Sequence, residues 1–243
     1  MLKEVLIIFF LCFSFSIETF SLENREIEKA MVRIITNNSL DGKHSCNGFA
    51  VQFKEKIYIV TVNHVLYDEK PEIMADILII EDKNGKRVFF GKNDFKKYLT
   101  QNAGIPGERV DIAVVNLPSM HDLDITPILF DFVANNAMLR DLEEKFNANL
   151  NKKVISRVYF YDRNSEEVEI GKSLFVNEPV SSGQRMVGIK VLEDKIREGD
   201  CGSPIVFSSS VIGIVTTESK GIQKNSMGIL ETIQKAESKP LKT

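Results

Sequence analysis

The sequence is poor in the residues that would point to a metalloprotein or a disulfide scaffold. It has no tryptophan, and its 243 residues include only three cysteines and three histidines. Cys12 lies in the leading segment, so Cys46 and Cys201 could form at most one disulfide in the rest of the chain. No His/Cys cluster has the spacing of metal ligands, and we predict neither a metal nor another cofactor.

Charge is also nearly balanced. The formal net charge is −3, so nothing indicates a broad basic surface of the kind that binds nucleic acid, and we predict no nucleic-acid partner. We find no internal repeat and no low-complexity segment. The composition, 43% hydrophobic and 27% charged, is that of an ordinary globular protein with one or two domains.

The longest apolar run is at the start of the chain. Lys3 precedes an apolar core from Val5 to Phe13, and small residues follow, as in a signal peptide. The run is short for a membrane span. We therefore predict a signal peptide over residues 1–21 and an exported protein, periplasmic or secreted, with an uncleaved anchor as the alternative.

A small-residue turn near the C-terminus has the composition of a nucleophile site. It reads Gly199-Asp200-Cys201-Gly202-Ser203-Pro204, with a thiol between two glycines. Glycine lets the backbone bend sharply and approach a ligand closely. The amides of Gly199 and Cys201 could then hold an oxyanion, while the Cys201 thiol attacks a carbonyl.

Two further motifs supply a base and a group to orient it. His64 ends the apolar run from Ile59, and Asp111 opens the apolar run to Val115. The order His64, Asp111, Cys201 resembles the chymotrypsin-like (trypsin-like) peptidase family, whose signatures are T-A-x-H, D-I-A-L/V and G-D-S-G-G-P. The usual serine is Cys201 here, as in the viral 3C-like branch, and the usual second glycine is Ser203. His44 and His121 are alternative bases, but neither ends a strand pair.

The resemblance implies an all-β fold of two packed six-stranded antiparallel β-barrels. It implies an N-terminal barrel over residues 22–132, a linking helix over 133–153 and a C-terminal barrel over 154–243 that ends in a helix. An apolar residue recurs every four positions at Met138, Leu142, Phe146 and Leu150, and this spacing independently predicts a helix there. We expect strands at residues 31–36, 49–53, 57–62, 73–80, 87–90 and 110–117, and a loop over 94–107.

In the second half we expect strands at residues 154–161, 167–170, 173–176, 186–192, 205–207 and 211–215. Cys46 lies in the strand before the histidine, where many family members have a disulfide. Its usual partner position is Val65, so we predict that Cys46 is a free buried thiol. A redox pair with Cys201 is the alternative.

The resemblance also implies a substrate site. Lys195 falls at the pocket floor by ungapped counting and would favour an acidic side chain. Thr216, Thr217 and Glu218 fall on the strand edge that binds substrate backbone, and Glu218 replaces a glycine at the pocket mouth. Lys195 and Glu218 favour opposite charges, so no side-chain preference is predicted.

Three hypotheses follow. The first is an exported endopeptidase that hydrolyses peptide bonds through Cys201, His64 and Asp111 and an acyl-enzyme intermediate. The second is an inactive pseudoprotease of the same fold that binds a peptide or protein. The third, a membrane-anchored structural protein, has only the N-terminal segment in its favour.

Overall fold

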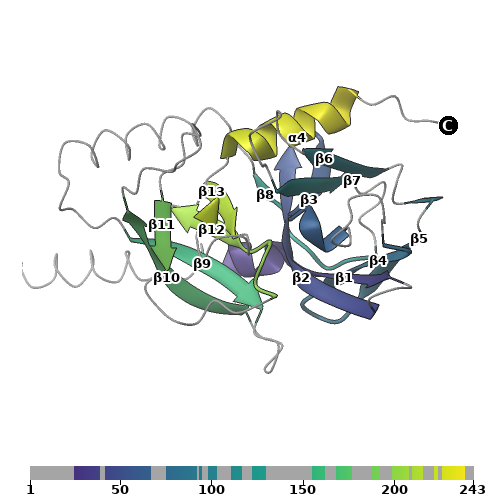
Figure 1. The fold of residues 1–243 in the computed structure, drawn as a ribbon, viewed down its shortest axis with the longest axis horizontal. Coiled ribbons are helices and arrows are strands. Elements are labelled where there is room, and N and C mark those ends of the chain that lie inside the picture. The colour runs from purple at the N-terminus through teal and green to yellow at the C-terminus, as the bar shows by residue number, and fades with distance from the viewer. Residues whose placement is uncertain are drawn as a thin grey trace, which may run out of the picture.

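The computed structural model describes fourteen segments of the chain. They are residues 25–38, 42–66, 75–91, 93–94, 98–102, 111–116, 122–129, 155–161, 168–176, 188–191, 199–207, 210–215, 222–223 and 226–238. Two sheets contain nearly all of the regular structure, and Figure 1 shows them side by side, with helix α4 (Ser226–Ser238) above. Residues 25–30 form a short helix that leads into the first strand.

The first sheet has eight strands in the order β5-β4-β1-β2-β3-β7-β6, with β8 paired to β2. All pairs are antiparallel except β2 with β8. The strands are β1 (Met31–Asn38), β2 (Gly42–Phe53), β3 (Lys56–Thr61), β4 (Ile77–Asp82), β5 (Arg87–Gly91), β6 (Leu99–Asn102), β7 (Ile112–Asn116) and β8 (Ile128–Leu129).

The second sheet has six antiparallel strands in the order β11-β10-β9-β12-β13-β14. They are β9 (Ile155–Tyr161), β10 (Val168–Val176), β11 (Gly188–Val191), β12 (Pro204–Phe207), β13 (Ser210–Val215) and β14 (Ile222–Gln223). The turn with Cys201 immediately precedes β12.

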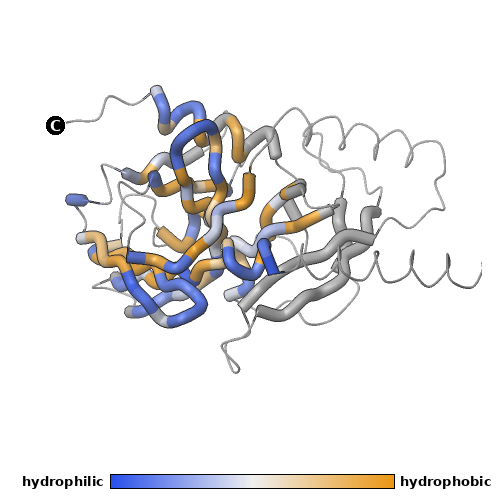
Figure 2. Tube along the Cα trace, turned by 180° about the vertical axis from the view of Figure 1, so that it is seen from behind, coloured by the Kyte–Doolittle hydropathy of each residue, from blue (hydrophilic) through white to orange (hydrophobic). Residues whose placement is uncertain are grey.

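One hydrophobic core joins the first sheet to α4. β-Branched and aromatic residues make up most of strands β3 and β7, and this favours a pleated strand with buried faces. Ile229, Leu230 and Ile233 of α4 are buried in the same core. Figure 2 shows hydrophilic residues gathered at hairpin turns and hydrophobic residues along the strands between them. Lys54 in the β2–β3 turn also bonds Glu237 of α4 at 2.7 Å.

The expected all-β fold is confirmed, with a C-terminal helix. The second sheet has six strands, but one of them, β14, was not predicted. The first sheet has eight strands, two more than the six that we predicted. The additional strands are β6 and β8. β6 lies inside the segment 94–107 that we expected to be a loop, so that prediction is wrong in part. β10 is continuous over the two strands expected at 167–170 and 173–176.

The predicted helix over 133–153 lies outside the described residues, as does the predicted signal peptide. In the portion of the chain that the structure describes, no helix is both long enough and apolar enough to cross a membrane.

Tyr58 offers a test of the core. Its side chain is fully buried, and within the described structure its hydroxyl has no hydrogen-bond partner. Burial, and secondarily the charge of Glu237, raises the pKa of Tyr58 to about 12. A buried hydroxyl without a partner costs free energy, so we expect Tyr58→Phe to leave stability unchanged or raise it by about 1 kcal/mol in urea unfolding.

The pH dependence of this variant follows from the raised pKa. The unfolded phenol ionises from about pH 10, whereas the folded one stays neutral to about pH 12. The stability that depends on neutral Tyr58 is complete below pH 10 and is lost as the pH rises through 12. The advantage of Tyr58→Phe should therefore grow over this range. A loss of 2 kcal/mol or more at pH 7 would mean that the hydroxyl has a partner.

Candidate active site

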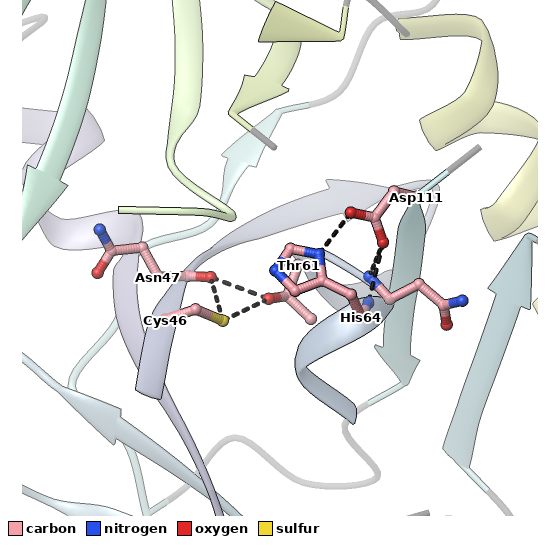
Figure 3. Close-up of polar contacts among 6 residues, drawn as sticks. Cys46, Asn47, Thr61, His64 and Asp111 are labelled. Carbon is pink, nitrogen blue, oxygen red and sulfur yellow. Dashed lines mark hydrogen bonds and ion pairs between the residues drawn. The ribbon is translucent and has the colours of Figure 1, made fainter. Parts of the chain in front are cut away.

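His64 and Asp111 meet at one edge of the first sheet. Thr61 at the end of β3 pairs with Ala113 near the start of β7. The chain leaves β3 into a short 3₁₀ turn, His64–Leu66, while Asp111 immediately precedes β7. The antiparallel register therefore brings the two side chains together, and His64 Nδ1 lies 2.6 Å from Asp111 Oδ2 (Figure 3).

The second carboxylate oxygen of Asp111 holds the backbone beneath the imidazole. Oδ1 accepts hydrogen bonds from the amides of Asn63 at 2.8 Å and His64 at 2.9 Å. A third bond supports the same turn from β1, because Thr36 Oγ1 donates to the carbonyl of Val65 at 3.0 Å. Asp111 thus fixes both the ring and the main chain of His64.

The surroundings of His64 favour the imidazolium form. Burial of the ring works against the charge and by itself lowers the pKa. Hydrogen bonds to Asp111 and Cys201, together with the negative charge that these residues can carry, outweigh burial and raise the pKa of His64 to about 10. Since Nδ1 faces Asp111, Nε2 is the ring nitrogen available to Cys201.

Two glycines shape the turn that contains Cys201. Gly199 has φ 101° and Gly202 has φ 84°, a backbone region that residues with a side chain rarely adopt. The Gly202 amide donates to the Val215 carbonyl at 2.8 Å, and this fixes the turn against β13. Cys201 itself is 2% exposed.

Asn47 of β2 connects this turn to the first sheet. Its backbone N–H donates to the Cys201 carbonyl at 2.8 Å, and its side-chain Nδ2 donates to Ser203 Oγ at 2.9 Å. Its own carbonyl accepts a bond from Thr61 Oγ1 at 2.9 Å, as Figure 3 shows. One residue therefore contacts the Cys201 turn on one side and the end of β3 on the other.

Both described cysteines are free and buried, which confirms the prediction for Cys46. Cys46 Sγ lies 3.3 Å from Thr61 Oγ1 and bonds the Asn47 carbonyl at 3.3 Å. The thiol therefore occupies a polar position beside the joint between the sheets rather than a purely apolar one.

The structure places His64 Nδ1 2.6 Å from Asp111 Oδ2, and Cys201 lies near enough to His64 to contribute to its raised pKa. Gly199 also lies in the Cys201 turn. His44, the alternative base, is exposed on β2. The other alternative base and the predicted substrate residues lie outside the described residues; these are His121, Lys195, Thr216, Thr217 and Glu218. No group of metal-ligating side chains occurs in the described segments.

Sequence reasoning missed Asn47 and gave the Ser203 hydroxyl no role. Asn47 lies between Cys46 and Gly48, in the strand that already carried part of the family resemblance. The sequence held no clear signal for its role, because the burial of Asn47, at 3% exposure, becomes apparent only in the folded chain.

Gly202 tests how tightly the two sheets meet. A Cβ at this position would lie 1.9 Å from the Asn47 carbonyl oxygen, whereas a Cβ at Gly85, which has a similar φ of 78°, would contact nothing within 4 Å. We expect Gly85→Ala to cost about 1–2 kcal/mol from backbone strain. Gly202→Ala should cost at least about 3 kcal/mol, because the clash comes in addition to the strain. Equal losses in thermal unfolding would contradict this packing.

Solved protease structures share the fold. A serine endoprotease from Yersinia pestis is 16% identical, with a TM-score of 0.55, and the match covers 89% of this chain and 66% of that one. An HtrA-type protease, AlgW, solved with a tripeptide, is 13% identical at a TM-score of 0.54, covering 88% and 62%. A scabies mite inactivated protease paralogue is 13% identical at 0.56, covering 88% and 96%. The chain thus spans less than two thirds of the first two structures.

No curated protein sequence matches this chain. The model of the Trypsin family, in contrast, matches residues 23–238, which is most of the chain. The match includes both sheets, α4 and the three residues His64, Asp111 and Cys201. The chain belongs to the Trypsin family.

Proposed function

We propose that this protein is a peptidase in which Cys201 is the nucleophile, His64 the general base and acid, and Asp111 the group that orients His64. The observation that carries the proposal is the position of His64, whose Nδ1 lies 2.6 Å from Asp111 Oδ2 and which is close enough to Cys201 for that residue to help raise its pKa. A nucleophile, a base and an orienting group in contact are the parts that covalent acyl transfer needs.

The first step uses the Cys201–His64 contact. His64 takes the thiol proton on Nε2, or already holds it at neutral pH, and Cys201 Sγ attacks the scissile carbonyl carbon. The raised pKa of His64, about 10, favours the imidazolium that this transfer creates. The negative charge of Asp111 stabilises the same imidazolium and holds Nδ1–H toward the carboxylate, so that Nε2 faces the reacting atoms.

The remaining steps complete hydrolysis. Charge builds on the carbonyl oxygen, and the amides of Gly199 and Cys201 are the proposed donors to it, each worth about 3 kcal/mol. The C–N bond then breaks, and the amine leaves with the proton from Nε2, which leaves a thioester on Cys201. Water attacks the thioester carbon as it gives a proton to Nε2; the C–S bond then breaks, the acid product leaves, and Cys201 Sγ takes the proton back from Nε2.

Peptides or proteins are the proposed substrates, and Lys195, Thr216, Thr217 and Glu218 remain the proposed contacts for them. We also propose that the protein is exported, to the periplasm or beyond the cell, after removal of residues 1–21. The apolar core of that segment, preceded by Lys3, supports this part of the proposal.

A second candidate function is a binding module without turnover. The burial of Cys201, 2% exposed, favours it, because a substrate carbonyl must reach Sγ. One protein with a similar fold is itself described as an inactivated protease paralogue. This candidate predicts tight peptide binding that survives Cys201→Ala and no product in any variant.

The decisive test combines thiol reactivity with peptide cleavage in the chain from residue 22. We expect iodoacetamide to alkylate Cys201 rapidly at pH 7, and His64→Ala to slow this at least about tenfold, because the thiol loses the base beside it. Cleavage of a peptide library should disappear in Cys201→Ala and fall by about 10³-fold or more in His64→Ala.

Cys46→Ala is the matched control, because it removes the other described thiol and should leave both signals in place. Alkylation that His64→Ala does not change, with no peptide cleaved by the wild type, would contradict the peptidase and favour the binding module.

Asp111→Asn tests the orienting role. Asparagine has only one acceptor oxygen, so it cannot accept from both backbone amides and also from Nδ1–H. We expect cleavage to fall about 10³–10⁴-fold with little loss of peptide affinity. Wild-type cleavage should decline as the pH rises through about 10, because His64 loses its proton there.

The pH profile of this variant gives a second check. Loss of the Asp111 charge removes a cause that raises the pKa of His64, so the alkaline decline should move to lower pH in Asp111→Asn. A variant with wild-type cleavage and an unchanged profile would rule out this role for Asp111.

A further inference from the structure

We propose that the side chains of Asn47 and Ser203 form a buried hydrogen-bond relay that positions Cys201 against His64. The proposal deepens the proposed function and rests on it, because it concerns the same nucleophile. It assigns a positioning role to two residues that do not touch the reacting atoms.

The relay runs from one sheet into the Cys201 turn. Asn47 Nδ2 donates to Ser203 Oγ at 2.9 Å, and Ser203 Oγ donates to the Asp200 carbonyl at 2.6 Å. All three residues are buried, with Ser203 at 0% and Asn47 at 3% exposure. Hydrogen bonds in such surroundings are costly to leave unmade, so the relay has one strongly preferred geometry.

Donor and acceptor types fix the direction of the relay. The Asp200 carbonyl can only accept, so the Ser203 hydroxyl proton points toward it. Ser203 Oγ can then only accept from Asn47, which requires the amide nitrogen and not the amide oxygen on that side. No other orientation of the Asn47 side chain satisfies the hydroxyl.

The relay acts on Cys201 because its bonds are made on both sides of that residue. Asp200 precedes Cys201, and Ser203 follows it by two residues. The backbone N–H of Asn47 also donates to the Cys201 carbonyl at 2.8 Å. Backbone bonds between the turn and Val215 fix it to β13, but the Asn47 backbone bond is a single attachment to the first sheet and would allow the turn to rotate relative to that sheet. The side-chain bonds add a second attachment and oppose that rotation.

The same residue also reaches the segment that carries His64. Thr61 Oγ1 donates to the Asn47 carbonyl at 2.9 Å, and Thr61 is three positions before His64. Asn47 is therefore a shared reference for the base and the nucleophile. The family resemblance expects glycine at position 203, which could not complete this relay. Asn47 and Ser203 thus depend on each other.

The test uses Asn47→Ala, Ser203→Ala and the double variant in the chain from residue 22. His64 is followed by NMR as it titrates, because Asp111 and Cys201 are the two groups that raise its pKa, to about 10. Cys201→Ala gives the value expected when the Cys201 contact is lost. Each single variant should shift the His64 titration toward that value by about one pH unit, which is a tenfold change in proton affinity. The double variant should shift it no further.

Alkylation of Cys201 at pH 7 and peptide cleavage are read beside the titration. We expect kcat to fall about 10–100-fold in both single variants while KM changes little, because a small misplacement of the nucleophile affects the chemical step.

Asp82→Ala is the stability control. Asp82 is buried, caps the β4–β5 hairpin through the amides of Asn84 and Lys86, and also accepts from the Asp124 amide; none of these bonds involves the Cys201 turn. It should lower the unfolding temperature but leave the His64 titration unchanged. If Asn47→Ala does not unfold cooperatively, Ser203→Gly carries the test, since glycine introduces no new atoms.

Unchanged His64 titration and unchanged kcat in Asn47→Ala and Ser203→Ala would overturn the relay, even if both variants were less stable. Failure of the peptidase proposal has a different signature. A wild type that cleaves no peptide, but whose His64 titration still shifts in the relay variants, would remove the peptidase and leave the relay.

Discussion

The contact between Asn47 and the Cys201 turn is the constraint on which the rest of the site depends. His64 and Asp111 belong to one sheet and Cys201 to the approach of the other, so no single sheet fixes their spacing. The Asn47 amide bonds the Cys201 carbonyl at 2.8 Å, and Gly202 leaves no room for even one more carbon atom against the Asn47 carbonyl. Acyl transfer tolerates misplacement of only about 1 Å, and this joint sets the spacing.

Within the first sheet, hydrogen bonds also hold the charged carboxylate of Asp111 in a fixed position. One carboxylate oxygen of Asp111 accepts hydrogen bonds from two backbone amides, and the other contacts the imidazole. The position of the carboxylate is therefore fixed without a substrate. A carboxylate fixed in this way needs no reorganisation when the imidazolium forms, and preorganised charge is what electrostatic catalysis requires. The antiparallel pairing of β3 with β7 is what makes this possible, because it places residues 47 positions apart at the same edge.

The sequence predicted the parts of the fold and site that have local signals. The β-branched runs predicted β3 and β7. The family order singled out His64, Asp111 and Cys201 as a group, and their roles stay predictions. β6 was missed because Leu99–Asn102 is a short strand. Its pairing with β7 is a tertiary contact, which a local sequence pattern does not predict. Asn47 was missed for a similar reason. An asparagine in a strand reads as a solvent-facing residue until its partner, 156 positions away, is known.

Burying a charged imidazolium at His64 costs free energy. This cost helps to decide between Cys201 as a nucleophile and Cys201 in an inactive binding module. Burial works against the imidazolium, and hydrogen bonding to Asp111 and Cys201 together with the negative charge that they can carry outweighs it. A module that merely binds peptides could replace His64 with an apolar side chain and avoid the cost altogether. It would also have no need for a carboxylate that is bonded three times to hold the histidine in place. Both residues are present beside Cys201, and this physical argument favours the proposed peptidase over the binding module.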